Sequence, residues 1–549
     1  MTQHTDRKSQ FTNYTYDSLD RLSQITYADS STISYTYDGV GRLTQVTDSI
    51  SGTITYAYDN LDRLLSETTG LGTVSYTYDA VGRRATMSVP GQSVVNYAYD
   101  NANRLTQITQ GTSTVTIGYD NADRRTSLTL PNGVVTEYAY DVASQLVSLA
   151  YNKAGNTLGN LTYEYDSAGH RVRIGGSFAR TNLPAALTSA GYNTANQQTA
   201  FGGQMFSYDL NGNLTGDGTN TYTWNARDEL VSISGSVAAS FQYDAVGRRR
   251  GKTIGGTNTN FLYDGANIVQ EQVGGSASAN TLTGRVDQLF TRTDASGSMT
   301  ALSDGIGSNI ALADSTGVVQ TQYTYEPFGE TTETGAGTTN SQKYTSREDD
   351  GTGLYYYRAR YYSPTLQRFI GEDPIEFGGG DINLYAYVGN NPISFSDRFG
   401  LQHPYEQITH NAAKMGPPPL GGRSCGTAGN RDVEVIFETY RRRVDQLTEE
   451  GKRHRNAYWN NFSSYWNGYL GCGQQAGRVI TTLRSLPKGS LEDEWTFEFE
   501  ATPFADFHVW GRGTSKNPSH PDIVFDPWHD EIYCEPHGTR QLLNGLRHF

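Results

Sequence analysis

The sequence predicts a mainly β protein in which a long, repetitive β-ribbon is followed by a smaller α+β domain. The first observation is a Tyr-Asp pair that recurs at a nearly fixed spacing over the first 270 residues. Second, aromatic residues make up 12% of the chain and charged residues only 18%, which favours folded β-structure over disorder. Third, all three Cys, eight of the ten His and five of the six Trp lie after Leu401. We therefore expect a repeat region up to Leu401 and a separate domain beyond it.

The Tyr-Asp repeats have a period of 20 or 21 residues, which is typical of stacked repeat architectures. Aromatic residues stand at alternate positions, as in Tyr56-Ala57-Tyr58, so they lie on one face of a strand. Polar alternating stretches such as RLTQVT supply a partner strand, and short Gly-containing stretches supply hairpin turns. Each repeat is therefore predicted to form two strands and two turns. The repeated Asp stands at Asp17, Asp38, Asp59, Asp79, Asp100, Asp120 and Asp141, and looser copies follow.

The position three residues after the repeated Asp predicts a left-handed turn. It is Gly, Asn or Asp in eleven of twelve repeats, and Ser144 is the exception. These three residue types most readily accept a positive φ. The repeated Asp can itself accept hydrogen bonds from backbone N–H groups two residues further on, as in Asx-turns. We interpret the row of Asp residues as turn formers; the alternative is a string of calcium-binding or catalytic carboxylates.

Charge and cysteine content exclude several classes of protein. The net charge is -14, and residues 402–549 hold 16 Lys+Arg against 18 Asp+Glu, so neither part has the basic excess of a nucleic-acid binder. Three Cys form no disulfide framework, and we interpret them as free thiols. No apolar segment predicts a signal peptide or a membrane span. We expect secretion by a specialised system without a signal peptide, or a place at the cell surface.

A second signature follows the repeats, LYYYRARYYSPTLQRFIGEDPIEFGGGDINLYAYVGNNPISFSDRFGL at Leu354 to Leu401. With the repeats, it makes residues 11–401 resemble the RHS/YD-repeat family, whose β-ribbon spirals into a hollow shell. The resemblance implies a YD-repeat β-shell over 1–285, an RHS core segment over 286–401 and a toxin domain over 402–549. Enclosing a 148-residue tail takes about 370–440 strand residues. Because residues 1–401 include many turns, we expect an incomplete shell or a piece of a longer chain.

The resemblance also implies that the core segment cuts the chain after Leu401, at Leu401–Gln402, by chemistry similar to that of an aspartyl protease. Two carboxylates held close together cannot both ionise, so one serves as acid while the other activates water. The positions that match the family are Asp373 and Asp397, with Arg368 and Arg360 as basic residues. Arg398 replaces the family's Pro after the second Asp, and a cation there works against a shared proton. The alternative is that both Asp residues form turns in an uncut loop.

The tail begins with a predicted tether over 402–431, followed by a predicted helix. Cys472 follows Gly471 at a predicted helix start, where the helix dipole lowers the pKa of a thiol. His508 and Asp526 lie on two predicted strands that a short hairpin would bring together, so that Asp526 orients the imidazole that accepts the thiol proton. The segments G-C-x-x-x-A, H-V-W and V-F-D-P-W resemble papain-like and transglutaminase-like cysteine enzymes.

Two other interpretations of the tail stay open. His520, His529, Cys534 and His537 could instead bind a metal, since the last three are near ligand spacing, and a metal-dependent nuclease would follow. Alternatively, Cys472 is a buried small residue, His508 a strand histidine and Asp526 a turn cap.

The sequence supports two classes of function. In the first, an RHS-repeat toxin encloses, cuts and releases a cysteine-dependent effector that acts on protein amides inside a target cell, as protease, deamidase or transglutaminase. Such a toxin acts in interbacterial or host antagonism; its expected partners are a cognate immunity protein and a target protein, without nucleic acid, and no cofactor is expected. In the second, the protein is a non-enzymatic surface adhesin whose tail is a folded cap.

Overall fold

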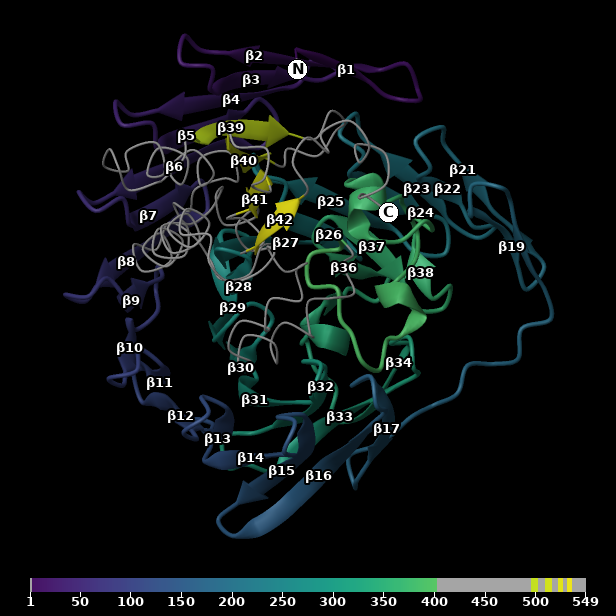
Figure 1. Ribbon diagram of the computed structural model, residues 1–549. Helices are drawn as coiled ribbons and strands as arrows, with labels where there is room; N and C mark the ends of the chain where they lie inside the picture. Colours follow the sequence, from purple (N-terminus) through teal and green to yellow (C-terminus); the bar gives the residue numbers. More distant parts are fainter. Residues whose placement is uncertain (1, 402–494, 502–508, 516–521, 527–530, 536–549) are drawn as a thin grey trace. The chain divides into compact units, whose positions relative to one another are not determined.

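The computed structural model describes residues 2–401 and four strands of the later chain, at 495–501, 509–515, 522–526 and 531–535 (Figure 1). The chain divides into two compact units. The first comprises Met1–Asp59 and Leu65–Gln407, and the second comprises Asn60–Leu64 and Ile408–Phe549. The described residues are mainly β, as the sequence predicts, and none of their helices is long and apolar enough to cross a membrane.

Residues 3–175, here called the first winding, form one antiparallel ribbon in which each strand pairs with the next along the chain. Figure 1 shows these strands following one another in chain order, from purple to blue. The strands are β1 (Gln3–Thr5), β2 (Phe11–Tyr16), β3 (Leu22–Thr26), β4 (Thr32–Tyr37), β5 (Leu43–Asp48), β6 (Gly52–Tyr58), β7 (Leu64–Thr69), β8 (Gly72–Tyr78), β9 (Arg84–Ser88), β10 (Val95–Tyr99), β11 (Leu105–Gln110), β12 (Ser113–Tyr119), β13 (Arg125–Thr129), β14 (Val134–Tyr140), β15 (Leu146–Lys153), β16 (Asn156–Tyr165) and β17 (Arg171–Gly175).

A small three-stranded sheet separates this ribbon from the second winding, residues 207–335, which has the same meander. The small sheet consists of β18 (Ala190–Tyr192), β19 (Gln198–Phe201) and β20 (Gln204–Met205). The second winding consists of β21 (Ser207–Tyr208), β22 (Leu214–Gly216), β23 (Thr221–Trp224), β24 (Leu230–Ser234), β25 (Ala239–Tyr243), β26 (Arg249–Ile254), β27 (Thr257–Asp264), β28 (Asn267–Val273), β29 (Ser276–Thr283), β30 (Leu289–Asp294), β31 (Gly297–Ser303), β32 (Asn309–Ala313), β33 (Val319–Tyr325) and β34 (Thr331–Gly335). The ribbon thus continues past residue 285, where the sequence places the start of the core segment.

The repeat turns have the geometry that the sequence predicts. Eleven of the twelve positions three residues after the repeated Asp have a positive φ, Ser144 among them at 63°. Asn267 differs because its hairpin is tighter: it pairs with Asp264 inside β28, and Gly265 takes the positive φ instead. The repeated Asp forms an Asx-turn. Oδ1 of Asp38 accepts the N–H groups of Val40 at 3.0 Å and Arg42 at 2.9 Å, which supports the turn-forming interpretation.

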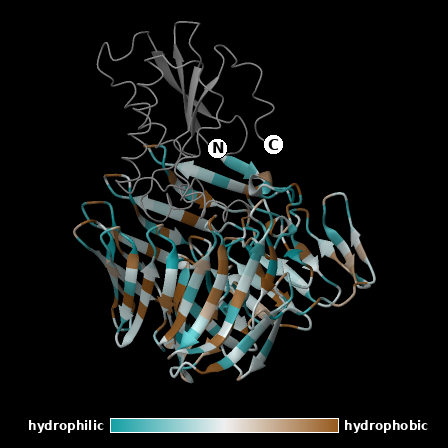
Figure 2. Cartoon of the chain, turned by 60° about the horizontal axis from the view of Figure 1, so that its bottom comes forward, coloured by the Kyte–Doolittle hydropathy of each residue, from teal (hydrophilic) through white to brown (hydrophobic). Residues whose placement is uncertain are grey.

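The two windings lie edge to edge, since residues about 180 positions apart meet repeatedly. Arg227 binds Asp48 at 2.8 Å, Arg84 binds Asp264 at 2.7 Å, and Gln270 donates to the carbonyl of Pro90. Apolar contacts join the same edges, where Ala245 packs with Ile33, Val46 and Ile54. Along the strands, hydrophobic and hydrophilic residues alternate (Figure 2). The ribbon is therefore a spiral. Ion pairs and buried aliphatic groups hold its two windings together.

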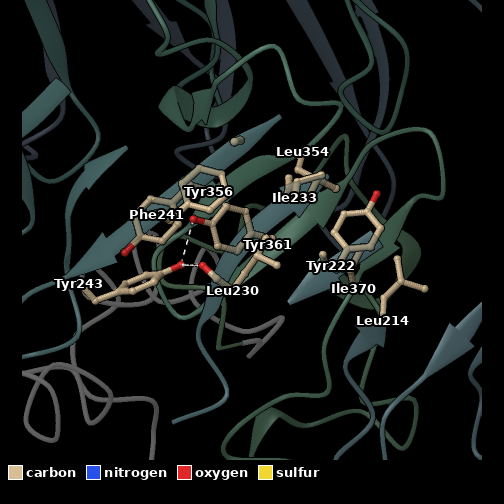
Figure 3. Close-up of a cluster of buried hydrophobic side chains, with 11 residues drawn as sticks. Leu214, Tyr222, Leu230, Ile233, Phe241, Tyr243, Leu354, Tyr356, Tyr361 and Ile370 are labelled. Carbon is tan, nitrogen blue, oxygen red and sulfur yellow. Dashed lines mark hydrogen bonds between the residues drawn. The ribbon is translucent and has the colours of Figure 1, made fainter. Parts of the chain in front are cut away.

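The core segment packs against the second winding. Its four-stranded sheet comprises β35 (Glu348–Asp349), β36 (Tyr355–Tyr357), β37 (Arg360–Ser363) and β38 (Arg368–Phe369), with 3₁₀ turns η1 (Tyr344–Ser346), η2 (Glu376–Gly379) and η3 (Val388–Asn390). Figure 3 shows Tyr356 and Tyr361 of this sheet against Phe241 and Tyr243, with the Tyr243 hydroxyl 3.0 Å from that of Tyr361. This apolar cluster fixes the core segment on the ribbon.

The described part of the tail is one antiparallel sheet. Its strands are β39 (Trp495–Ala501), β40 (Val509–Ser515), β41 (Asp522–Asp526) and β42 (Glu531–Glu535), paired in chain order. Of the two strands predicted around His508 and Asp526, the second is β41, and β40 begins at Val509, directly after His508 in the sequence. The predicted helix after the tether lies outside the described residues.

Candidate functional site

Asp373 and Asp397, which the sequence predicts as a carboxylate pair, lie on either side of one guanidinium. Nη2 of Arg360 is 2.8 Å from Oδ2 of Asp373 and 3.6 Å from Oδ2 of Asp397. Arg360 is the first residue of β37, and its guanidinium also stacks on the ring of Phe369 at 3.6 Å. All three charged side chains are at most 4% exposed. A buried cation thus stands between two buried acids, whereas an aspartyl-protease pair would face each other directly.

Asp397 holds the end of the core segment. Its Oδ1 accepts the backbone N–H groups of Phe399 at 3.2 Å, Gly400 at 2.8 Å and Leu401 at 3.1 Å. Its Oδ2 accepts no hydrogen bond from the described residues. Arg360 binds the same loop: its Nε donates to the carbonyl of Gly400 at 2.5 Å. The carboxyl group therefore lies within one residue of the predicted cut.

The two acids differ in their surroundings. Burial raises the pKa of Asp397, and this exceeds the opposing influence of Arg360 and of the three backbone N–H groups. Asp373 has the shorter contact with Arg360, and its Oδ1 accepts the N–H of Ile375 at 3.0 Å. A guanidinium at that distance favours the charged form of a carboxyl group. The arrangement thus pairs a carboxyl group whose pKa is raised by burial, that of Asp397, with one in close contact with the guanidinium, that of Asp373.

Arg368 and Arg398 lie differently from what the sequence suggests. Arg368 donates to the carbonyl of Asn196 at 2.6 Å and stacks on Tyr192 and Tyr385, and none of these partners is either acid. The sequence predicts that Arg398 favours the ionised form of Asp397. Instead, its charge helps to lower the pKa of Asp287, and burial leaves the pKa of Asp397 raised. Of the described basic residues, Arg360 is the one with ion pairs to both acids.

Sequence reasoning missed Arg358 and Asp287. Arg358 donates to the backbone carbonyl of Arg398 and to Oδ1 of Asp287, the latter at 2.6 Å. Arg358 lies in the hairpin turn between β36 and β37 with a φ of 61°, so strand periodicity gives no signal for it in the sequence.

Most of the tail candidates lie outside the described residues: Cys472, His508, His520, His529 and His537. Two stand on described strands, Asp526 at the end of β41 and Cys534 in β42, where it pairs with Ile523. Gly511 pairs with Phe525, so the start of β40, directly after His508 in sequence, runs beside the end of β41. Among the residues described, no group of three or more His, Cys, Asp or Glu could hold a metal ion.

Comparisons with known proteins agree with this architecture in the repeat region. Residues 134–393 match the family model Teneurin YD-shell, and residues 37–74 and 58–94 match the RHS Repeat model. The solved structure of TcdB2-TccC3 superposes with a TM-score of 0.52 over 73% of this chain and 28% of that chain. At 18% identity, this similarity establishes the fold alone.

Curated relatives include proteins named as toxins and nucleases. The tRNA3(Ser)-specific nuclease WapA of Bacillus spizizenii is 34% identical over 254 residues, which are 44% of this chain and 11% of the relative. Double-stranded DNA deaminase toxin A of Burkholderia cenocepacia is 26% identical over 325 residues, 49% of this chain and 23% of the relative. This chain therefore spans between about a tenth and a quarter of the length of these two relatives.

Proposed function

We propose that this chain, whose repeat region the comparisons support as an RHS/YD-repeat shell, is part of a toxin that cuts itself between Leu401 and Gln402 to release its tail. The observation that carries this proposal is the buried triplet of Asp373, Arg360 and Asp397 on the backbone of residues 399–401. A loop that only needed to turn would not require two buried acids around one guanidinium, because burying charges costs free energy.

The chemistry that fits this geometry is hydrolysis by acid and base. Asp373, which lies 2.8 Å from the Arg360 guanidinium, accepts a proton from water, and the water oxygen bonds to the carbonyl carbon of Leu401. Asp397, whose pKa is raised by burial, donates a proton to the nitrogen of Gln402 as the carbon–nitrogen bond breaks. The products are a carboxylic acid at Leu401 and an amine at Gln402. Arg360 lies closer to Asp373, the base, than to Asp397, the acid, and so favours the charged form of Asp373 more strongly.

Purified wild-type protein tests this proposal directly on denaturing gels. We expect pieces of 401 and 148 residues without added protease, and one intact band from Asp373→Asn and from Asp397→Asn. Asp381→Asn is the matched control, because the Asp381 carboxylate makes a local contact with the N–H of Asn383. Cutting at the wild-type rate in both Asp373→Asn and Asp397→Asn would refute the roles proposed for these two acids.

We further propose that the released tail is the effector, with Cys472 as nucleophile, His508 as base and Asp526 as orienting acid. The support is the spacing of the three residues together with the pairing of β40 and β41, which brings the end of one strand beside the start of the other. Growth of cells that express the wild-type chain or its Cys472→Ala and His508→Ala variants tests this. Loss of toxicity in both variants is expected. Unchanged toxicity would overturn the triad.

A second candidate is a nucleic-acid effector, favoured by the names of the relatives, which include nucleases and a DNA deaminase. In that case His520, His529, Cys534 and His537 would bind a metal. Alkylation of thiols and treatment with EDTA separate the two candidates. The cysteine effector loses activity on alkylation and withstands EDTA, and the metal-dependent nuclease shows the reverse.

The proposal implies two kinds of partner. A cognate immunity protein would bind the tail in the producing cell, and a specialised secretion machinery would export the chain, as for secreted toxins of this kind. Co-expression tests the first. A neighbouring gene product that rescues growth should bind residues 402–549, and failure of every such candidate to bind would count against a toxic tail.

A further inference from the structure

Residues 358–360 bind three successive backbone carbonyls just before the proposed cut. The Arg358 guanidinium donates to the carbonyl of Arg398, the backbone N–H of Ala359 donates to that of Phe399 at 3.0 Å, and Nε of Arg360 donates to that of Gly400. All three contacts are with backbone atoms. We call residues 358–360 the clamp. Its contacts fix the position of residues 398–400 along the clamp, and so also the position of the next residue, Leu401.

The Arg358 end of the clamp is anchored to the second winding. Nη2 of Arg358 lies 2.6 Å from Oδ1 of Asp287 and 3.2 Å from the carbonyl of Ala266. Both partners belong to repeat turns, and Asp287 has the positive φ, 65°, typical of the turn position discussed above. The ring of Phe399 also lies 5.0 Å from the Arg358 guanidinium. A turn residue that elsewhere is near the surface here fixes an arginine against the end of the core segment.

Asp287 is itself held in its charged form. Burial alone would raise its pKa, but Arg347 and Arg358 bring the pKa below its usual value. Its side chain is 7% exposed and that of Arg347 is 2% exposed. Arg347 also binds the same carboxylate. Such a buried, fully paired carboxylate holds Arg358 in one position.

We propose that Arg358, oriented by Asp287, is a positioning residue that sets the register of self-cleavage. This inference rests on the proposed cutting after Leu401. With the carbonyls of residues 398, 399 and 400 fixed in turn, the next carbonyl, that of Leu401, is the one presented to Asp373 and Asp397. Arg358 contacts neither acid in the described structure. It acts through the position of the peptide and leaves the proton transfers to the acids.

The test compares full-length wild type with Arg358→Met, Arg358→Lys and Asp287→Asn, with Arg173→Met as the surface control. Each chain is refolded from denaturant, and intact mass follows the rate and position of cutting over time. Arg358→Met should cut at least about tenfold more slowly and give additional products that end beside Leu401, while the pH dependence of the rate stays as in wild type. Arg360→Met, which removes the cation between the acids, should change that pH dependence.

Each outcome decides the matter. Cutting of Arg358→Met at the wild-type rate and only after Leu401 overturns the positioning role while leaving self-cleavage intact. If wild type itself stays uncut, self-cleavage fails and the positioning role fails with it. Should Arg358→Met not fold, Arg358→Lys serves, because lysine keeps the charge but lacks the fork that binds Asp287 and the carbonyl together. A wild-type rate and a single product from Arg358→Lys would likewise overturn the role.

Discussion

Arg248 of the second winding donates to Glu67 of the first winding, with 2.6 Å between Nη2 and Oε1. The two residues are 181 positions apart and both side chains are buried. Nε of Arg248 meanwhile keeps the bond within its own repeat, to Asp244 at 2.7 Å. The arginine of this repeat turn thus also joins the two windings.

Removing Arg248 should destabilise the shell strongly. Arg248→Met leaves the Glu67 charge buried without its partner, which costs about 3–5 kcal/mol. The free energy of unfolding in urea measures this cost. Arg83→Met is the matched control: Arg83 occupies the same repeat position, but its carboxylate partner is Asp79 of its own turn. If Arg83→Met lowers the free energy of unfolding as much as Arg248→Met does, the contact between Arg248 and Glu67 does not hold the windings together.

The Arg248→Met defect should shrink at low pH. Burial raises the pKa of Glu67, and Arg248 opposes this rise. A raised pKa in the folded state means that stability is lost as pH rises and regained as the carboxyl takes up a proton. Unfolding of the variant and wild type at pH 5 and pH 8 tests the sign, and a larger difference at pH 5 would be inconsistent with it.

Ser144→Asn should stabilise the first winding. Ser144 holds a φ of 63°, which Asn adopts more readily. The side-chain contact is kept, because Ser144 accepts a hydrogen bond from Arg124 at 3.2 Å and Asn103, at the equivalent position, accepts one from Arg83 at 2.9 Å. We expect a gain of about 0.5–1 kcal/mol in the free energy of unfolding. The reverse substitution, Asn103→Ser, serves as control and should lose stability, so equal signs for the two would argue against a backbone cause.

Gly400→Ala should impair cutting more than folding. Gly400 has a φ of 68°, and an added Cβ would lie 2.4 Å from the carbonyl oxygen of Tyr357. Displacing this residue moves the backbone at the end of the core segment, next to the proposed cut. Cutting should slow about tenfold or more, with little change in the unfolding midpoint. Gly351→Ala, where φ is positive but the space is open, is the control for strain alone.

The rate of cutting should fall as pH rises. Asp397 must carry its proton to act as acid, and burial raises the pKa of its carboxyl group above the usual value. Refolding intact chains into buffers between pH 4 and pH 9 gives the profile. A rate that increases steadily across this range would assign the acid to another group.

Much of the shell could be predicted from the sequence because its signals are local. The Asp of each repeat and the residue three positions later specify their turn through bonds within five residues, as Asp38 and Arg42 show. The exception at Asn267 arose from a shorter hairpin. Contacts between windings, such as Arg248 with Glu67, were not predictable, since they depend on the pitch of the spiral.

The candidate site was predictable only in part. Its two acids and Arg360 could be placed from the core signature. The roles of Arg368 and Arg398 could not, because which guanidinium reaches a buried acid depends on tertiary packing. Arg358 was missed for the same reason, as its anchor is a turn residue 71 positions away. The triad of Cys472, His508 and Asp526 stays a prediction.

The most direct test of self-cleavage is the intact mass of the purified full-length chain together with the N-terminal residue of its smaller piece. Two masses are predicted, for residues 1–401 and 402–549, with the mass of one water added in total and Gln402 at the new N-terminus. Asp397→Asn should give one mass for all 549 residues. A folded wild-type chain that keeps the single full-length mass would contradict the account.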